Sequence, residues 1–399
     1  MKQSRPIIAS MPVYLDHAAT SPLRPEALEA MLPYLTTNAG NPSSLHGTGR
    51  RARRAIDEAR ESVAQLIGAQ PREIVFTSGG TEADNLAVKG AAWAATARGR
   101  HIVTTAVEHK AVLNATAILE RANFDVVWLL VDEFGRVDPI DVAAALTERT
   151  TLVSVMAANN EVGTRQPIAA IGEIVRGHGA KLHVDAIQWA AHGEIDVNAW
   201  QADLVSLSAH KLGGPQGVGA LYVRRGTQLL PQLQGGSQER QRRAGTENVA
   251  GIVGFAAAFE LARTEASGEA DRLRELSSRL RAGLDQLEGV NLTGHPDERL
   301  PNNVSVVIEG VEGGDLVAAL DLEGIEVSTG SACTSGSTEP SHVLLAMGID
   351  PHLAHGSLRI TTGTETTAAD VDDALAAIRG VLPRLRGVEG VHPKVAATA

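Results

Sequence analysis

Short runs of β-branched and aliphatic residues alternate with amphipathic stretches through the first half of the chain. The runs predict seven strands, at 74–77, 101–105, 126–131, 152–156, 182–185, 204–207 and 220–223. Amphipathic periodicity predicts helices at 26–34, 49–67, 82–98, 111–121, 139–147 and 168–176. Strands that alternate with helices form a mostly parallel sheet covered on both faces. The pattern therefore predicts a large α/β domain with a seven-stranded, mostly parallel sheet.

The alternation ends after residue 223. A polar stretch over 232–243 is typical of an exposed loop, and two helices are predicted at 246–263 and 269–287. A smaller α+β unit follows, with strands predicted at 304–308, 325–328 and 358–361 and helices at 316–322, 341–347 and from 367. We expect a large domain over 14–260, a small C-terminal domain over 261–388 with the N-terminal arm 1–13, and a flexible tail over 389–399.

Composition and charge exclude several classes of protein. The 399 residues are 43% hydrophobic and 21% charged, which is typical of a globular protein. A net charge of −11 argues against a nucleic-acid partner, because phosphate binding needs clustered positive charge. No apolar run is long enough for a signal peptide or a membrane helix. One cysteine, Cys333, rules out an intramolecular disulfide. We expect a cytoplasmic protein.

Polar residues end two of the predicted central strands. Asp185 ends one strand, and Lys211 follows the next, just before a glycine-rich turn. Ligands of open α/β sheets bind beyond the carboxyl ends of the strands. A lysine and a carboxylate together there suit pyridoxal phosphate (PLP), which needs an amine for its aldehyde and an acid facing its ring nitrogen. The alternative for Lys211 is an ordinary surface lysine.

Two further strand ends carry candidate cofactor ligands. Gly80 and Thr81 lie between a strand and a helix, where free N–H groups and the helix dipole favour an anion such as a phosphate. An ordinary helix cap explains them equally well. Neither the GxGxxG fingerprint nor the P-loop occurs in the chain, so a nucleotide cofactor is not expected. His109 offers a flat ring for stacking and a titratable nitrogen, or it is a structural histidine.

Amides and one arginine complete the polar candidates. Asn160 and Gln188 could hydrogen-bond a phenolic oxygen, although such residues are usually found in turns. Arg359, in a predicted strand of the small domain, suits bidentate carboxylate binding, as an amino-acid substrate demands; most strand arginines face solvent. Two histidine pairs, His352 with His355 and His178 with His183, have no carboxylate or thiol partner at ligand spacing, so no metal site is predicted.

Cys333 lies in ten small, mostly polar residues, Ser328 to Ser337. Such residues cannot bury a thiol well, whereas structural cysteines occur in apolar elements. The thiolate is the nucleophilic form of cysteine. The composition of this stretch therefore indicates a reachable, reactive thiol; a surface thiol without a role is the alternative.

Taken together, these segments resemble the cysteine desulfurases of the NifS/IscS type, in the class V aminotransferase branch of fold-type I PLP enzymes. The resemblance runs from about residue 13 to 385. Its motifs include YLDHAAT, GNPSSLH, EIVFTSGGTEADNLA, TTAVEHKAVL, SVMAANNEVG, HVDAIQ, SLSAHKLGGPQGVGALYVRRG, QERQRRAGTEN and STGSACTSGSTEPSHVL. So many matches in one order are highly specific.

The resemblance implies a role for each candidate residue. Lys211 would bind PLP covalently, Asp185 would pair with the ring nitrogen, and His109 would stack on the ring and move protons. The implied phosphate ligands are Gly80, Thr81, Ser208 and His210, with Thr246 contributed by the partner subunit of a homodimer. Asn160 and Gln188 would contact the phenolic oxygen. The implied carboxylate ligands for substrate are Asn160, Arg359 and Asn41.

The implied reaction is sulfur abstraction from L-cysteine. Cys333 would take the sulfur as a persulfide, alanine would leave, and the sulfur would pass to an acceptor protein such as an iron–sulfur scaffold. A transient role for Cys333 as ligand of an iron–sulfur cluster stays open. The competing interpretations are a selenocysteine lyase or aminotransferase, for which the Cys333 stretch has no explanation, and a sulfur carrier that binds without catalysis.

Overall fold

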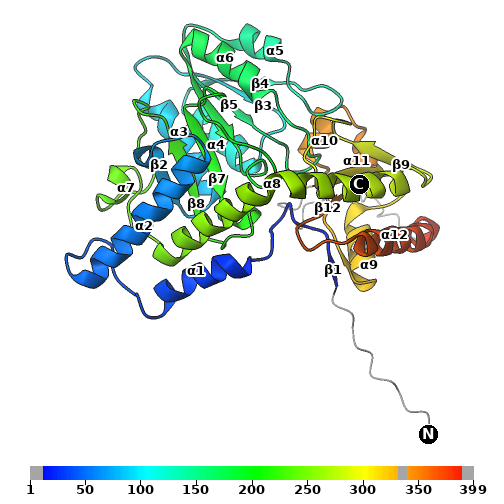
Figure 1. Ribbon diagram of the computed structural model, residues 1–399. Coiled ribbons are helices and arrows are strands. Elements are labelled where there is room, and N and C mark those ends of the chain that lie inside the picture. The colour runs from blue at the N-terminus through cyan, green and yellow to red at the C-terminus, as the bar shows by residue number, and fades with distance from the viewer. Residues whose placement is uncertain (1–11, 331–338, 389–399) are drawn as a thin grey trace, which may run out of the picture.

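The large sheet of the computed structural model has seven strands, as the hydrophobic pattern predicts (Figure 1). The structure describes residues 12–330 and 339–388. In spatial order the strands are β2 (Ile74–Thr77), β8 (Gly219–Val223), β7 (Leu204–Ser208), β6 (Lys181–Asp185), β5 (Thr150–Met156), β3 (His101–Thr105) and β4 (Asp125–Leu129). Only β8 runs against its neighbours. The carboxyl ends of the other strands therefore share one edge of the sheet.

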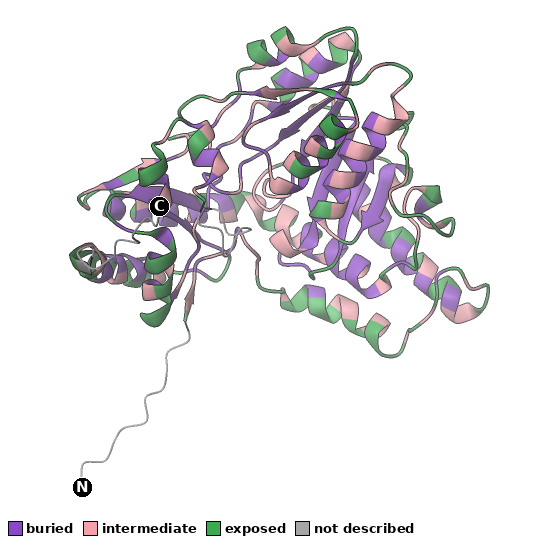
Figure 2. Ribbon diagram, turned by 180° about the vertical axis from the view of Figure 1, so that it is seen from behind, coloured by how far each residue is buried: buried purple, intermediate pink, exposed green. Residues whose placement is uncertain are grey.

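Helices cover this sheet, and Figure 2 shows its central strands in purple, whereas the edge strand β4 is only partly buried. The helices are α2 (Gly47–Leu66), α3 (Gly80–Ala94), α4 (Lys110–Arg121), α5 (Pro139–Ala145) and α6 (Ile168–His178), with α1 (Pro25–Leu35) at the periphery. Every described residue of β2, β3, β5, β7 and β8 is buried. Asp138 caps α5 by accepting from the N–H of Ile140, with Pro139 in the first turn.

The C-terminal unit is smaller and has its own core. Its strands are β9 (Val290–Thr293), β10 (Asn303–Ile308) and β12 (Ser357–Thr361) in an antiparallel sheet, and β1 (Val13–Tyr14) paired in parallel with β11 (Ile325–Glu326). Its helices are α9 (Gly313–Leu322), α10 (His342–Ala346), α11 (Pro351–His355) and α12 (Ala368–Val388). The predicted α+β class is confirmed, although β9 and α11 were not predicted.

One long helix corrects the prediction of two helices at 246–263 and 269–287. α8 (Val249–Leu284) is continuous over 36 residues, and Figure 1 shows it running from the large sheet to the small one. Its first half packs in the large core through Phe255 and Phe259, and its second half packs in the small core through Leu276 and Leu280. Gly268 lies inside this helix, and a glycine in a helix interior costs about 1 kcal/mol of stability. The burial of both ends of α8 outweighs this cost.

The polar stretch 232–243 is not a fully exposed loop, contrary to its prediction. It contains the short helix α7 (Gln238–Gln241), where Glu239 is buried. The Glu239 carboxylate accepts two hydrogen bonds from the buried Arg60 guanidinium and one from the N–H of Phe76. A buried guanidinium requires such a partner, so the pairing places this part of the stretch against the large domain.

Among the described residues, no helix combines the length and apolar composition that crossing a bilayer requires.

Candidate active site

A cavity of about 330 Å³ lies at the carboxyl ends of the large sheet, where it meets β12 of the small unit. The predicted site residues that line it are Gly80, Thr81, His109, Asn160, Asp185, Gln188, Ser208, His210, Lys211 and Arg359. All but Arg359 follow strands or begin helices of the large domain. Strand topology thus brings together residues from widely separated segments.

The Lys211 amine is held by the backbone of an N-terminal segment. Lys211 ends a short 3₁₀ turn that follows β7. Its Nζ donates to the carbonyl oxygens of Ala18 and Ala19, at 2.6 Å each. Gln188 Nε2 donates to the same Ala18 oxygen at 2.9 Å. The amine is therefore fixed at the cavity wall. Sequence reasoning missed both carbonyls, because backbone acceptors leave no trace in side-chain chemistry.

Asp185 ends β6 and is buried, with its Oδ1 accepting from the N–H of Ile187 at 2.9 Å. Burial raises its pKa to about 6, and the positive charge of Lys211 acts in the opposite direction. Asp84 on α3 is completely buried nearby, and burial together with the charge of Asp185 raises the Asp84 pKa well above its ordinary value. Of these two acids, Asp185 is the one that is ionised at neutral pH.

His109 caps α4, because its Nδ1 accepts from the N–H of Ala111 at 3.1 Å. Burial, together with the positive charge of Lys211, lowers the pKa of His109 to about 4. The ring is therefore neutral at pH 7. Since Nδ1 acts as an acceptor, the proton of the neutral ring is on Nε2.

The start of α3 forms an anion-binding corner. Gly79 adopts φ +148°, and α3 begins at Gly80. A Cβ at Gly80 would lie 2.2 Å from the end of the Ile187 side chain, so a larger residue there would require Ile187 to move. Ser208 Oγ is buried and has no hydrogen-bond partner among the described residues. Helix N–H groups beside an unsatisfied hydroxyl suit a phosphate. Together with the Lys211 amine and the Asp185 carboxylate, this corner fits pyridoxal phosphate.

Arg359 on β12 is only 2% exposed. Its Nη1 donates to the carbonyl oxygen of Asn160 at 3.0 Å, and its Nη2 donates to Asp16 Oδ1 at 2.8 Å. The side chain points toward the large domain instead of toward solvent. Asp16, within the YLDHAAT motif, was not assigned a role from the sequence. Its position in the motif was the available signal.

Two predicted residues lie away from the cavity of this chain. Asn41 is exposed, and its Oδ1 accepts from the N–H of Ser43 in a local turn. Thr246 is also exposed. Cys333 lies outside the described residues, but Gly330 and His342, on either side of its stretch, both line the cavity. The roles of Asn41, Thr246 and Cys333 stay predictions.

Glu161 is a second residue that sequence reasoning did not assign. It lines the cavity, and its carboxylate accepts a hydrogen bond from Ser341 Oγ. Ser341 in turn caps α10 by accepting from the N–H groups of Val343 and Leu344. Burial raises the Glu161 pKa to about 7. Glu161 therefore anchors the first helix after the Cys333 stretch to the large domain.

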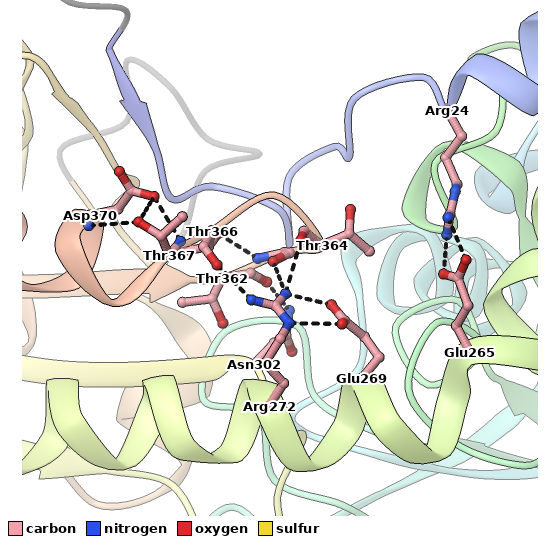
Figure 3. Close-up of polar contacts among 11 residues, drawn as sticks. Arg24, Glu265, Glu269, Arg272, Asn302, Thr362, Thr364, Thr366, Thr367 and Asp370 are labelled. Carbon is pink, nitrogen blue, oxygen red and sulfur yellow. Dashed lines mark hydrogen bonds and ion pairs between the residues drawn. The ribbon is translucent and has the colours of Figure 1, made fainter.

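Ion pairs on α8 support the opposite side of Lys211, where a smaller cavity of about 70 Å³ lies. Arg24 and Glu265 form two hydrogen bonds at 2.7 and 2.8 Å. Figure 3 shows Arg272 pointing toward Glu269 and toward the loop that follows β12. Arg272 donates to the carbonyl oxygens of Gly363, Thr364 and Thr366. Both the N-terminal segment and the end of β12 are thus fastened to one helix.

We expect the cofactor-free protein to be most stable near pH 6.5. Burial holds six histidines neutral by lowering their pKa values. The pKa is lowered to about 3 for His183 and to about 4 for His17, His109, His192, His210 and His342. Below their ordinary value of 6.5 the unfolded chain binds protons that the folded chain does not, so acid favours unfolding. Burial raises the pKa of Glu108 to about 8 and of Glu161 to about 7. Above pH 6.5 these acids, together with the buried Asp84, act without opposition from the histidines, and the folded chain then loses stability as the pH rises.

One fully buried group changes the free energy of unfolding by about 1.4 kcal/mol per pH unit between its two pKa values. Urea unfolding at about pH 5, 6.5 and 8 compares the effect of the buried histidines on stability with that of the buried acids. The midpoint should be highest at the middle pH. A midpoint that rises steadily to pH 8 would show that the buried acids are ionised in the folded protein.

Comparisons with known proteins agree with this geometry. The sequence profile of the class-V aminotransferases matches residues 13–374. A cysteine desulfurase IscS from Methanosarcina thermophila is 48% identical over 382 residues, which cover 96% of this chain and 95% of the relative. A solved NifS-like protein superposes with a TM-score of 0.89 at 39% identity, covering 94% of this chain and all of that one. SspA, solved in complex with cysteine, superposes with a TM-score of 0.78 at 35% identity, covering 87% and 98%. The chain therefore belongs to the class-V aminotransferase family.

Proposed function

We propose that the protein is a PLP-dependent cysteine desulfurase, which converts L-cysteine into L-alanine and transfers the sulfur to Cys333. The observation that carries the proposal is the convergence on one cavity of the Lys211 amine, the ionised Asp185 carboxylate and the Arg359 guanidinium. These are the groups that a PLP enzyme needs to hold its cofactor and an amino-acid carboxylate. The similarity to the IscS desulfurase extends over nearly the whole chain.

Each group has a distinct task in this proposal. When bound, the cofactor withdraws electrons from the Cα atom of the amino acid attached to it. Asp185 would face the ring nitrogen of the cofactor and hold the proton there. Lys211 would supply the amine that attaches the cofactor between reactions. The carbonyl groups of Ala18 and Ala19 receive that amine whenever it is released.

Substrate orientation follows from the groups around Arg359. The guanidinium has donors left on both Nη1 and Nη2 after its bonds to Asn160 and Asp16, because each nitrogen carries two hydrogens. These donors bind the substrate carboxylate. The substrate thiol then points away from Arg359, and the neutral ring of His109 can donate a hydrogen bond from Nε2 to the substrate.

The sulfur transfer balances without any additional oxidant. The Cys333 thiolate forms a bond to the substrate sulfur while the bond between that sulfur and the substrate Cβ breaks. The electron pair of the broken bond stays with the three-carbon fragment, which gains a proton and leaves as alanine. Cys333 is left as a persulfide. An acceptor protein such as an iron–sulfur scaffold then takes the sulfur, and we propose a cytoplasmic setting for this delivery.

We further propose that two copies of the chain form a dimer through α1. Leu28, Leu32 and Leu35 lie at helical spacing and are 42%, 45% and 58% exposed, and Leu45, in the segment that follows α1, is 90% exposed. A stripe of exposed leucines indicates a protein interface. Because Thr246 is exposed and does not line the cavity of its own chain, a partner is the natural recipient of its side chain.

The substitution Leu32→Glu should shift the dimer toward monomer, because it places a charge in an apolar interface. Sedimentation equilibrium checks this at concentrations of about 1–10 μM, within the range in which most specific dimers persist. Ile118→Glu on α4 is the matched control, since Ile118 is 44% exposed but outside the stripe. A wild-type monomer, or equal effects of both variants, would contradict the proposed interface.

The reaction itself is tested by incubating the purified protein with L-cysteine and a reductant while alanine and sulfide are quantified. The desulfurase predicts equal amounts of the two products. Pyruvate or another oxo acid without sulfide would indicate transamination. Protein that is colourless and takes up no PLP would return the non-catalytic carrier as the better interpretation.

A further inference from the structure

The short N-terminal segment 16–19 contacts Arg359 and Lys211, the two cationic side chains that face the cavity and are needed for the proposed reaction. Asp16 pairs with Arg359, with 2.8 Å between Oδ1 and Nη2. Ala18 and Ala19 hold the Lys211 amine through their carbonyl oxygens. The segment therefore supplies oxygen acceptors at the two places where an amino-acid substrate and its cofactor would interact with the enzyme.

The segment is anchored by backbone hydrogen bonds. The N–H of His17 donates to the Thr361 carbonyl, and the N–H of Thr361 donates to the Leu15 carbonyl. The N–H of Ala18 donates to Thr361 Oγ1, and the Tyr14 hydroxyl donates to the Thr20 carbonyl. Since the backbone on both sides of Asp16 is pinned, its carboxylate stays within reach of Arg359.

A buried guanidinium needs a counter-charge when no substrate is bound. Arg359 is 2% exposed, and its buried Nε has no hydrogen-bond partner in the part of the chain that the structure describes. Within the described residues, Asp16 is the only carboxylate within 4.0 Å of this guanidinium. The nearby acid Glu161 is engaged with Ser341 instead. Leaving such a cation unpaired in a buried site is strongly unfavourable.

We propose that Asp16 is a stand-in for the substrate carboxylate: it neutralises Arg359 in the empty site and competes with the carboxylate of the bound amino acid. The inference rests on the proposed function, because it takes Arg359 as the carboxylate ligand. Two carboxylates on one guanidinium repel each other in a buried site. Asp16 therefore weakens the binding of L-cysteine and equally weakens the binding of L-alanine, which favours release of the product.

The test is Asp16→Asn, which keeps the size and the acceptor oxygen of the side chain but removes its charge. We expect the KM for L-cysteine to fall about threefold to tenfold, with kcat unchanged or lower. L-Cysteine methyl ester, which has no carboxylate, should show no such gain. Asp16→Glu, which keeps the charge, should not lower the KM.

A second readout does not depend on turnover. L-Alanine should raise the melting temperature of Asp16→Asn more than that of the wild type, because the added carboxylate restores the missing counter-charge. A variant damaged only in its packing would not regain stability from alanine. If the asparagine variant does not fold, Asp16→Ser allows the same comparison, since it leaves room for water beside the guanidinium.

Three outcomes decide the matter. A lower KM for L-cysteine alone, with greater stabilisation by alanine, supports the stand-in. A higher KM for L-cysteine in Asp16→Asn overturns it and makes Asp16 a residue that only orients Arg359. If Arg359→Ala leaves the KM for L-cysteine unchanged, Arg359 does not bind the substrate carboxylate. The proposed role of Asp16 is then wrong. PLP binding and desulfuration would be unaffected by this result.

Discussion

Replacing Lys211 with alanine will abolish the covalent attachment of PLP and lower alanine production from L-cysteine by about a thousandfold or more. The reason is geometric as well as chemical. Lys211 Nζ is fixed by two carbonyl oxygens beside Asp185 and the anion-binding corner. Lys110 also lines the cavity, but it begins α4 rather than following β7. The loss should therefore not be compensated by another amine.

Borohydride reduction followed by mass spectrometry measures this directly. Wild-type protein should retain the cofactor mass on the peptide that contains Lys211, and the variant should not. Lys89→Ala is the control. Lys89 lies on α3 and is partly buried, and the variant should keep both the label and the activity. Label found on the Lys211→Ala protein would show that another lysine carries the cofactor.

Cys333→Ala should eliminate sulfide release and lower alanine formation by about a hundredfold or more, because the nucleophile that breaks the carbon–sulfur bond is gone. Cofactor binding should persist, since the residues that fit PLP lie on the large domain. Cys333 is the only cysteine of the chain. A persulfide detected by alkylation and mass spectrometry can therefore belong to no other residue.

Ser335→Ala is the matched control for this experiment, because it changes a small polar residue in the same stretch. It should retain both products. Full alanine production by Cys333→Ala, with free sulfide, would mean that the substrate sulfur leaves without a protein acceptor, and the persulfide step would then be wrong. Failure of both variants would point instead to a requirement for the whole stretch.

The central strands and the residues at their ends were predictable from the sequence for one physical reason. A strand buried on both faces requires a nearly continuous apolar run, so the polar residue that ends the run is conspicuous. Asp185 follows such a run, and Lys211 comes shortly after another. The structure places both at the cavity. Arg359 was predictable as a polar exception in an apolar strand.

Interactions that depend on the backbone or on distant segments were not predictable. The carbonyl groups of Ala18 and Ala19 carry no side-chain signal. Asp16 is one acid among many until folding brings it to a strand more than three hundred residues away. Glu239 appeared to be part of a polar loop because its partner, Arg60, lies in a helix of otherwise ordinary amphipathic pattern.

α8 has a consequence for how the molecule loses its structure. The same helix contributes Phe255 and Phe259 to one core and Leu276 and Leu280 to the other. Melting of either core removes the support of half of this helix, and helix formation is cooperative along its length. The two cores should therefore melt as one thermodynamic unit, and the C-terminal unit is not a module that could be cut out and expressed alone.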